Sequence, residues 1–183
     1  MRRKSSTLRI IGGTWRSRVI RFAASADLRA TPDRVRETLF DWLGQDLSGR
    51  ACLDLFAGSG ALGFEALSRG ASRVVMVEKD RETCRVLEEN AARLGARGLT
   101  IQCADAIEFL ARASERFDVI FLDPPYRSGV AIELWARLPG CLAEGGLVYV
   151  ESGTRFAAVH PFALIRASRA GNVHFHLIGR SEQ

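Results

Sequence analysis

The chain is organised around the stretch Asp54-Leu55-Phe56-Ala57-Gly58-Ser59-Gly60-Ala61-Leu62-Gly63. The apolar run Ala51–Phe56 that leads into it is of the kind that forms a buried strand. After it, apolar residues recur at helical spacing as far as Gly70, a residue type that commonly ends helices. The stretch therefore predicts a strand, a glycine turn and a helix, and the glycines let the backbone turn tightly against a ligand.

A second apolar run, Arg73–Val77, leads to Glu78 and predicts a neighbouring strand with a carboxylate at its tip. Such a carboxylate can accept two hydrogen bonds from a ribose diol, and it repels a 2′-phosphate. Two ligands remain, an unphosphorylated nicotinamide dinucleotide and S-adenosylmethionine. Asp54 favours the second, because a buried acid suits the ammonium of a methionine moiety better than a pyrophosphate. A glycine turn that binds nothing is the plain alternative.

The rest of the chain alternates strand and helix patterns. Asp80 and Gly95 bracket one predicted helix, Asp105 is a candidate cap of the next, and Ser128–Leu138 is a third. Further strands are predicted at Leu99–Cys103, Phe117–Leu122 and Leu147–Val150, followed by an antiparallel pair at Phe162–Ala167 and Asn172–Ile178. Alternating units of this kind imply a mostly parallel sheet with its ligand-binding loops at one edge. The acids expected at that edge are Asp54, Glu78, Asp105 and Asp123. Asp105 either caps its helix or reaches an adenine amino group, and both roles can coexist.

The sequence Asp123-Pro124-Pro125-Tyr126 follows the fourth predicted strand of this sheet. Two prolines remove backbone donors and stiffen the chain, so the strand tip presents acceptors, the Asp123 carboxylate and the Pro124 carbonyl. These suit an exocyclic amine on a nucleobase, whose lone pair becomes nucleophilic when both hydrogens are accepted. Tyr126 can stack on that base. The motif predicts methyl transfer to an amino nitrogen, which depends on positioning more than on acid–base catalysis.

Positive charge is concentrated at the N-terminus. Residues 1–36 carry ten Lys or Arg against two Asp, a net +8, whereas the remaining residues carry −3 and the whole chain +5. Leu8–Ile11 and Val19–Phe22 predict a hairpin whose loop places Trp15 between arginines. That loop suits nucleic acid, although Trp15 can instead pack the hairpin onto the main domain. Thr31 and Pro32 predict the start of a helix whose apolar face excludes two arginines, Arg34 and Arg36.

Composition and residue spacing argue against several other classes of protein. No apolar run reaches the roughly 18 residues that a membrane span needs, and the basic N-terminus lacks the apolar segment of a secretory signal. The four cysteines show no C-x-x-C spacing, which favours buried free thiols in a reducing cytoplasm, with Cys52 and Cys103 in core strands. His174 and His176 share one face of a strand, and we interpret them as belonging to an exposed edge strand rather than to a metal site.

Taken together, the glycine stretch and Asp123-Pro124-Pro125-Tyr126 look like a Rossmann-like amino-methyltransferase. The segments Leu8–Gly13 and Arg29–Phe40 narrow this, and from about Leu8 to Glu151 the chain resembles the RsmD family of bacterial 16S rRNA guanine-N2 methyltransferases, which modify guanine 966. Ala30 and Ser17 depart from the family pattern. Both departures affect the geometry of the N-terminal arm and not the cofactor site.

The resemblance implies an S-adenosylmethionine-dependent α/β domain at 29–183, preceded by a basic arm and β-hairpin at 1–28. It assigns catalysis to Asp123, Pro124, Pro125 and Tyr126. It assigns the cofactor to Asp54, Phe56, Gly58, Gly60, Glu78, Asp105, Ala106, Asp123 and Thr31. It assigns RNA contacts to Arg9, Trp15, Arg16, Arg18, Arg21, Arg29, Arg34 and Arg36. It implies a cytoplasmic monomer without a metal, acting on 16S rRNA in a small-subunit particle.

Two other functions fit parts of the sequence. The Asp-Pro-Pro-Tyr motif also suits an adenine-N6 methyltransferase on DNA or RNA, because adenine offers an exocyclic amine too. A non-catalytic RNA-binding assembly factor could retain a methyltransferase fold. A dinucleotide oxidoreductase would need a hydride-transfer site, which the sequence does not suggest.

Overall fold

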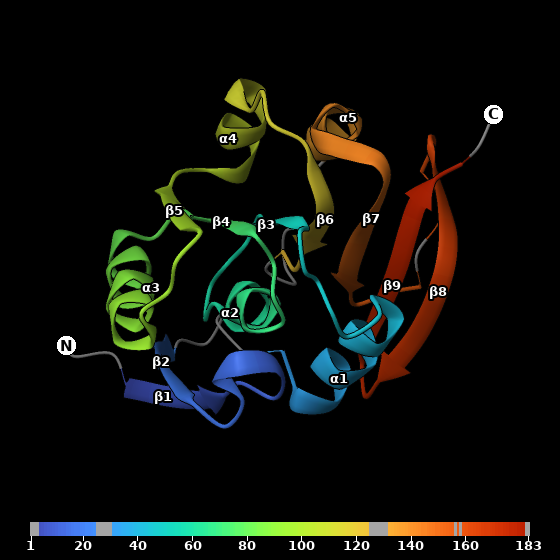
Figure 1. Ribbon diagram of the computed structural model, residues 1–183. Coiled ribbons are helices and arrows are strands. Elements are labelled where there is room, and N and C mark those ends of the chain that lie inside the picture. Colours follow the sequence, from blue (N-terminus) through green and yellow to red (C-terminus); the bar gives the residue numbers. More distant parts are fainter. Residues whose placement is uncertain (1–3, 25–30, 125–131, 156, 158, 182–183) are drawn as a thin grey trace.

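A twisted, mostly parallel sheet forms the centre of the molecule. The computed structural model describes residues 4–24, 31–124, 132–155, 157 and 159–181. Within these residues the central sheet has seven strands in the order β5-β4-β3-β6-β7-β9-β8 (Figure 1). Their bounds are Ala51–Asp54 (β3), Arg73–Glu78 (β4), Leu99–Cys103 (β5), Phe117–Leu122 (β6), Leu142–Ser152 (β7), Phe162–Ala170 (β8) and Val173–Arg180 (β9). The first five are parallel, and β9 lies antiparallel between β7 and β8, which confirms the predicted fold class.

Helices cover both faces of this sheet. One face packs against α1 (Asp33–Trp42), α2 (Ala61–Ser68) and α3 (Arg81–Leu94), and the other against α4 (Ala106–Arg112) and α5 (Ile132–Cys141) (Figure 1). Because both faces are covered, the central strands are apolar throughout, as in Val74–Val77. None of the helices that the structure describes is long and apolar enough to span a bilayer.

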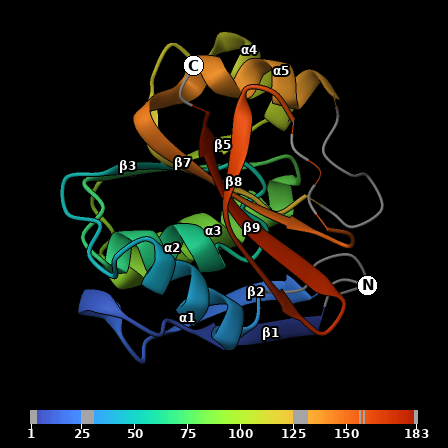
Figure 2. The ribbon, with the colours of Figure 1, turned by 90° about the vertical axis from the view of Figure 1, so that its right-hand side faces the viewer.

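The predicted N-terminal hairpin forms a further layer beneath α2 and α3, but its first strand is Lys4–Arg9 and not Leu8–Ile11 as predicted. Strands β1 (Lys4–Arg9) and β2 (Val19–Ala24) pair with each other, and the loop between them contains a short 3-10 helix, η1 (Gly13–Trp15) (Figures 1 and 2). Ile10 and Ile20 are fully buried within the same apolar core as α2 and the sheet. The Asn90 side chain of α3 receives the Arg21 N–H at 3.0 Å and donates to the Arg21 carbonyl at 2.7 Å, so it continues the hairpin's hydrogen bonding.

The order of the strands reverses between β3 and β6. From β3 the chain continues outward through β4 and β5, and then returns to place β6 and β7 on the other side of β3. Open parallel sheets bind ligands at the carboxyl ends of the strands where the order reverses. Asp54, the last residue of β3, and Asp123, which follows β6, are therefore at the expected ligand-binding position.

Capping residues set several helix ends as predicted. Asp80 accepts the Thr83 N–H at 3.0 Å, and Gly95 ends α3 in the left-handed region at a φ of 66°. The start of α1 differs by one residue, because Pro32 precedes the first helical residue and the Thr31 side chain does not cap the helix. Of the helix predicted at Ser128–Leu138, the part within 128–131 lies outside the described residues.

Two predictions for the C-terminal half were wrong. Strand β7 begins at Leu142, five residues before the predicted Leu147, because Leu142 pairs with Phe117 and a register shift accommodates Gly145 and Gly146 within the strand. Strand β9 is not an exposed edge strand, since β8 pairs with its outer side and His176 is 1% exposed.

The prediction of buried free thiols is correct for three of the four cysteines. Cys52, Cys84 and Cys141 are buried free thiols, whereas Cys103 is exposed. Its strand, β5, is the edge of the sheet, and its burial pattern is correspondingly open.

Candidate active site

Packing and conformation both explain the glycine turn. Gly60 has a φ of +77°, and a Cβ there would lie 2.6 Å from the Phe64 ring. A Cβ on Gly63 would lie 2.4 Å from the Met76 side chain, because α2 passes close over β4 at this point. The Gly63 N–H donates to Asp54 Oδ2 at 3.1 Å, which joins the end of β3 to the first turn of α2. The turn is therefore held rigidly against the sheet, with Gly58 and Gly60 at its tip.

Glu78 braces the same turn from the neighbouring strand. Its Oε2 accepts the Gly58 N–H at 3.0 Å, and its Oε1 accepts the Asp80 N–H at 2.8 Å. Each carboxylate oxygen retains a second lone pair, so the half-buried side chain still has acceptor capacity for a diol. The ribose contact stays a prediction, and Glu78 has a structural role that sequence reasoning did not identify.

Asp54 is a buried acid without a cationic partner among the described residues. It is 2% exposed, and burial raises the pKa of its carboxyl to about 7, with a further rise from Glu78 and opposing backbone hydrogen bonds from Gly63 and Phe56. A cationic group placed beside it would relieve this unfavourable burial. The Asp54 carboxylate thus fits the ammonium of S-adenosylmethionine, and that contact stays a prediction.

Asp123 lies one strand away, at the end of β6, where Phe121 pairs with Asp54. Its Oδ2 accepts the Thr31 hydroxyl at 3.4 Å, and its backbone continues into the buried Pro124. Burial raises the pKa of Asp123 well above its ordinary value, and the carboxyls of Glu151 and Asp54 raise it further, while the Thr31 hydroxyl lowers it. Two predicted residues of this motif, Pro125 and Tyr126, lie outside the described residues.

Sequence reasoning missed a third acid in this group, Glu151. It follows Val150, the partner of Leu122, so it lies beside Asp123 at the carboxyl edge of the sheet. Glu151 is 3% exposed, its Oε1 accepts the Tyr149 hydroxyl at 2.8 Å, and burial raises the pKa of its carboxyl. A signal for it was present in the sequence. Strands β3 and β4 end in an acid and β6 is followed directly by one, so an acid at the end of β7 could have been expected there too.

Asp105 confirms its predicted role as a helix cap. Its Oδ1 accepts the Ile107 N–H at 2.8 Å and the Glu108 N–H at 3.4 Å, and the buried Ala106 begins α4. The proposed contact of Asp105 with an adenine amino group and the cofactor contact of Ala106 stay predictions. The half-buried Phe56 packs against the core on the α4 side of the sheet.

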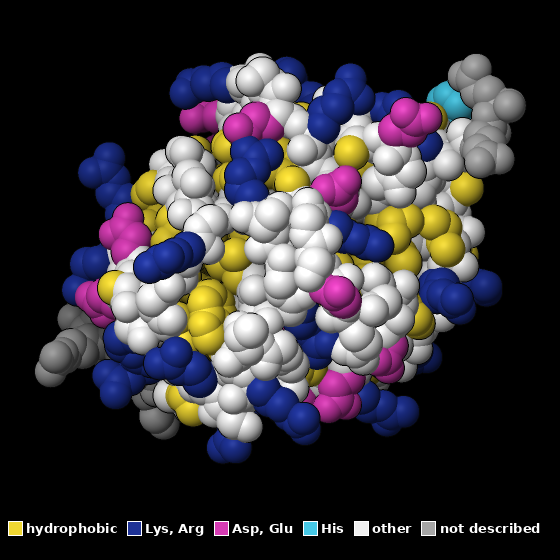
Figure 3. Space-filling view, in the orientation of Figure 1, with side chains coloured by type: hydrophobic (Ala, Val, Ile, Leu, Met, Phe, Trp, Pro, Cys, Tyr) yellow, Lys and Arg dark blue, Asp and Glu magenta, His cyan; other side chains and the backbone are white. Residues whose placement is uncertain are grey.

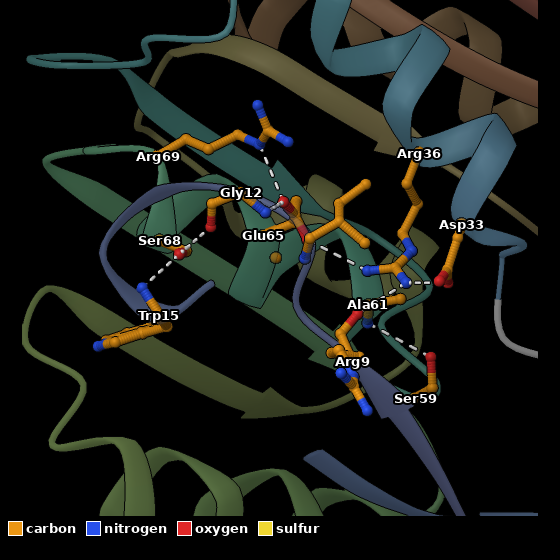
Figure 4. Close-up of polar contacts among 12 residues, drawn as sticks. Arg9, Gly12, Trp15, Asp33, Arg36, Ser59, Ala61, Glu65, Ser68 and Arg69 are labelled. Carbon is orange, nitrogen blue, oxygen red and sulfur yellow. Dashed lines mark hydrogen bonds and ion pairs between the residues drawn. The ribbon is translucent and has the colours of Figure 1, made fainter. Parts of the chain in front are cut away.

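A second acidic centre, Glu65 in α2, joins the hairpin to α1. Glu65 is fully buried and accepts hydrogen bonds from the Ile11 and Gly12 backbones at 3.0 and 2.7 Å (Figure 4). It also forms ion pairs with Arg36 at 3.1 Å and with Arg69 at 2.9 Å. The prediction that Arg36 faces away from the apolar side and contacts RNA was therefore wrong, because its guanidinium is buried and also bonds the Arg9 carbonyl and Asp33.

The other predicted RNA contacts separate into exposed and packed residues. Arg9, Arg16, Arg18, Arg21 and Arg34 are exposed. Lys and Arg side chains are numerous along the lower edge of Figure 3, where Figure 1 places the hairpin. Trp15 is half-buried against the core, which supports its packing role, and its backbone N–H donates to Ser68 Oγ at 2.8 Å. Arg29 lies outside the described residues.

Comparison with known proteins identifies the family. Residues 8–179 match the family model described as Conserved hypothetical protein 95. The chain is 41% identical to Ribosomal RNA small subunit methyltransferase D of Escherichia coli, over 98% of this chain and 93% of the relative. It is 36% identical to the protein of the same name from Haemophilus influenzae, over 93% of this chain and 92% of the relative.

Solved structures agree with this assignment. A structure from Escherichia coli described as a methyltransferase is 41% identical, superposes with a TM-score of 0.86, and covers 97% of this chain and 100% of its own. A methylase structure from Haemophilus influenzae, 33% identical, has a TM-score of 0.81 and covers 97% and 100%. The acids lie where the strand order reverses, and both the fold and the sequence match those of known methyltransferases. The chain therefore belongs to the RsmD family and is a methyltransferase.

Proposed function

We propose that the protein transfers a methyl group from S-adenosylmethionine to the exocyclic N2 amine of a guanine in 16S rRNA. The observation that carries this proposal is the position of Asp123-Pro124 at the tip of β6, beside the buried Asp54. Asp54 suits a cationic ligand, and Asp123 presents an acceptor to an amine next to it. The names of the relatives supply ribosomal RNA of the small subunit as the substrate class.

The chain's residues have separate tasks in this proposal. Asp54, the Gly58–Gly60 turn and Glu78 hold the cofactor, with Asp105, Ala106, Phe56 and Thr31 around it. When bound, S-adenosylmethionine supplies an electrophilic methyl group. Asp123 and the Pro124 carbonyl accept the two amino hydrogens of the base, which directs the nitrogen lone pair, and Tyr126 stacks on the ring. The contact of Asp123 strengthens as the nitrogen rehybridises, so it favours the transition state over the ground state.

The hairpin provides the RNA-binding part of the proposal. Exposed arginines on the 1–28 arm contact phosphates, and the 29–183 domain carries the chemistry. Trp15 and Arg36 are better explained as structural residues, because one packs on the core and the other is buried in an ion pair. We further propose that the protein acts as a cytoplasmic monomer on a small-subunit particle.

The test is methylation of small subunits that lack the modification, with isotopically labelled donor and analysis of the nucleosides formed. We expect label in N2-methylguanine of 16S rRNA. Label in N6-methyladenine would instead support the adenine alternative. Absence of both label and cofactor binding would support a non-catalytic assembly factor.

A further inference from the structure

Glu151 and Asp123 occupy equivalent positions on neighbouring strands. In the parallel pairing of β6 and β7, Leu122 lies opposite Val150, so Asp123 and Glu151 are the next residues along at the same edge. Both share the sheet face of Phe121 and Tyr149, whose rings are 6.5 Å apart on the side that α1 covers. Since paired strands are about 4.8 Å apart, the two carboxyl groups are close neighbours.

The surroundings of Glu151 contain hydroxyl donors but no described cation. Tyr149 donates to its Oε1 at 2.8 Å, and Thr31 lies between the two carboxyls, within hydrogen-bonding reach of both. Among the residues that the structure describes, no Lys or Arg forms an ion pair with either acid. One ionised carboxylate can accept about four hydrogen bonds, so two hydroxyls leave most of the acceptor capacity of this pair unused.

A structural role alone gives a poor explanation of this acid. Burying a carboxyl group without a cation is unfavourable, and a Gln of the same shape would satisfy the same Tyr149 hydroxyl without that cost. The unfavourable arrangement occurs beside Asp123, a residue that the proposed chemistry requires. A substrate that brings donors to both acids would account for it.

Guanine brings such donors. Its Watson–Crick edge presents the N1–H directly beside the N2 amine, whereas adenine presents a lone pair at N1 beside its N6 amine. With Asp123 on the amine, the adjacent acid meets a donor in guanine and a repelling lone pair in adenine. Enzymes that act on an extruded base recognise this edge.

Resting on the proposed function, we propose that Glu151 is a specificity-determining residue that accepts the N1–H of the target guanine while Asp123 accepts from its N2 amine. This contact selects guanine over adenine, a choice that the Asp-Pro-Pro-Tyr motif by itself leaves open. The proposed recognition requires only the guanine and the side chains of Asp123 and Glu151.

The test compares two bases at the target position of reconstituted small subunits, guanine and 2-aminopurine. Both carry the 2-amino group, but 2-aminopurine has a lone pair at N1. We expect the wild-type protein to prefer guanine in kcat/KM by about 10–100-fold, the discrimination of one well-placed polar contact. Glu151→Gln, whose amide can donate to a lone pair, should reduce that preference at least about tenfold by lowering activity on guanine more than on 2-aminopurine.

The control makes the same chemical change on the same strand. Glu144 is exposed near the opposite end of β7, so Glu144→Gln should leave the preference unchanged. Thermal unfolding of each variant separates a change in base recognition from a failure to fold. If Glu151→Gln fails to fold, the wild-type comparison still decides, because equal use of both bases overturns the role of Glu151.

The outcomes also separate the two proposals. Formation of N2-methylguanine together with an unchanged base preference in Glu151→Gln overturns only the assignment of Glu151. Methylation of adenine by the wild-type protein overturns the proposed function and this inference together.

Discussion

Two groups of fully or partly buried acids in this protein have opposite surroundings. Glu65 is fully buried but forms ion pairs with Arg36 and Arg69 and accepts two backbone N–H groups. The buried Asp54 and Glu151 and the half-buried Asp123 are gathered at the sheet edge, and within the described residues none forms an ion pair. Burial raises the pKa of all three. Burial of an acid therefore does not by itself indicate a site, whereas burial without a counter-charge does.

The largest effect on stability is expected when the paired acid is neutralised. Glu65→Gln leaves the Arg36 guanidinium buried without its carboxylate, so we expect the free energy of unfolding to fall by about 3–5 kcal/mol. Urea denaturation measures this. The control is Glu89→Gln, which removes the partner of an exposed Arg85 at 2.7 Å and should change stability by about 0.5 kcal/mol or less. Equal losses in the two variants would contradict the structural role of Glu65.

Neutralising an unpaired acid should instead affect the reaction. Asp123→Asn keeps the shape but replaces a charged acceptor with an amide that also donates, so we expect kcat to fall by about 10²–10³-fold. Single-turnover methylation measures the loss, and calorimetry checks that cofactor affinity is retained, because Asp54 lies one strand away. A wild-type rate with normal cofactor binding would rule out the proposed mechanism.

Asp54 allows a test in which stability and function change in opposite directions. Its folded pKa of about 7 lies above the ordinary 3.8, so the folded protein binds the proton more tightly than the unfolded chain, and this contribution to stability is lost as pH rises between these values. Asparagine has no carboxyl group to titrate, so the Asp54→Asn variant does not lose stability in this way as pH rises. Relative to wild type, its free energy of unfolding should increase from pH 4 to pH 8 by about 2–4 kcal/mol.

The same substitution should weaken binding of S-adenosylmethionine. Chemical denaturation across pH, with calorimetry of cofactor binding at pH 8, measures both effects. A stability difference that does not change with pH would show that Asp54 is already balanced by a partner in the free protein.

The smallest effects are expected on the hairpin, where the charges are exposed. Arg9→Gln and Arg16→Gln should each reduce the slope of log affinity for RNA against log salt by about 0.7–0.9 for each phosphate that the arginine neutralises. Arg112→Gln, an exposed change on α4 at the other face of the sheet, is the matched control. Point substitutions are preferable to removing the hairpin, because Ile10 and Ile20 belong to the core. Equal slopes in all three variants would exclude the hairpin as the RNA-binding surface.

The sequence alone determined the order of the elements, the parallel sheet with its antiparallel end, and four of the acids at its edge, Asp54, Glu78, Asp105 and Asp123. These features depend on local signals, since hydrophobic period, glycines and capping residues act over a few neighbouring positions. Tertiary structure decided which polar residues are structural and which are available. Arg36 has the spacing of a surface residue, yet Glu65, 29 positions away, holds it in the core. In the sequence, Glu151 is one acid among several at strand ends. Only the pairing of β6 with β7 places it beside Asp123. The free energy of a charged side chain depends on partners that only the folded chain brings together, and for that reason these two roles could not be predicted from sequence.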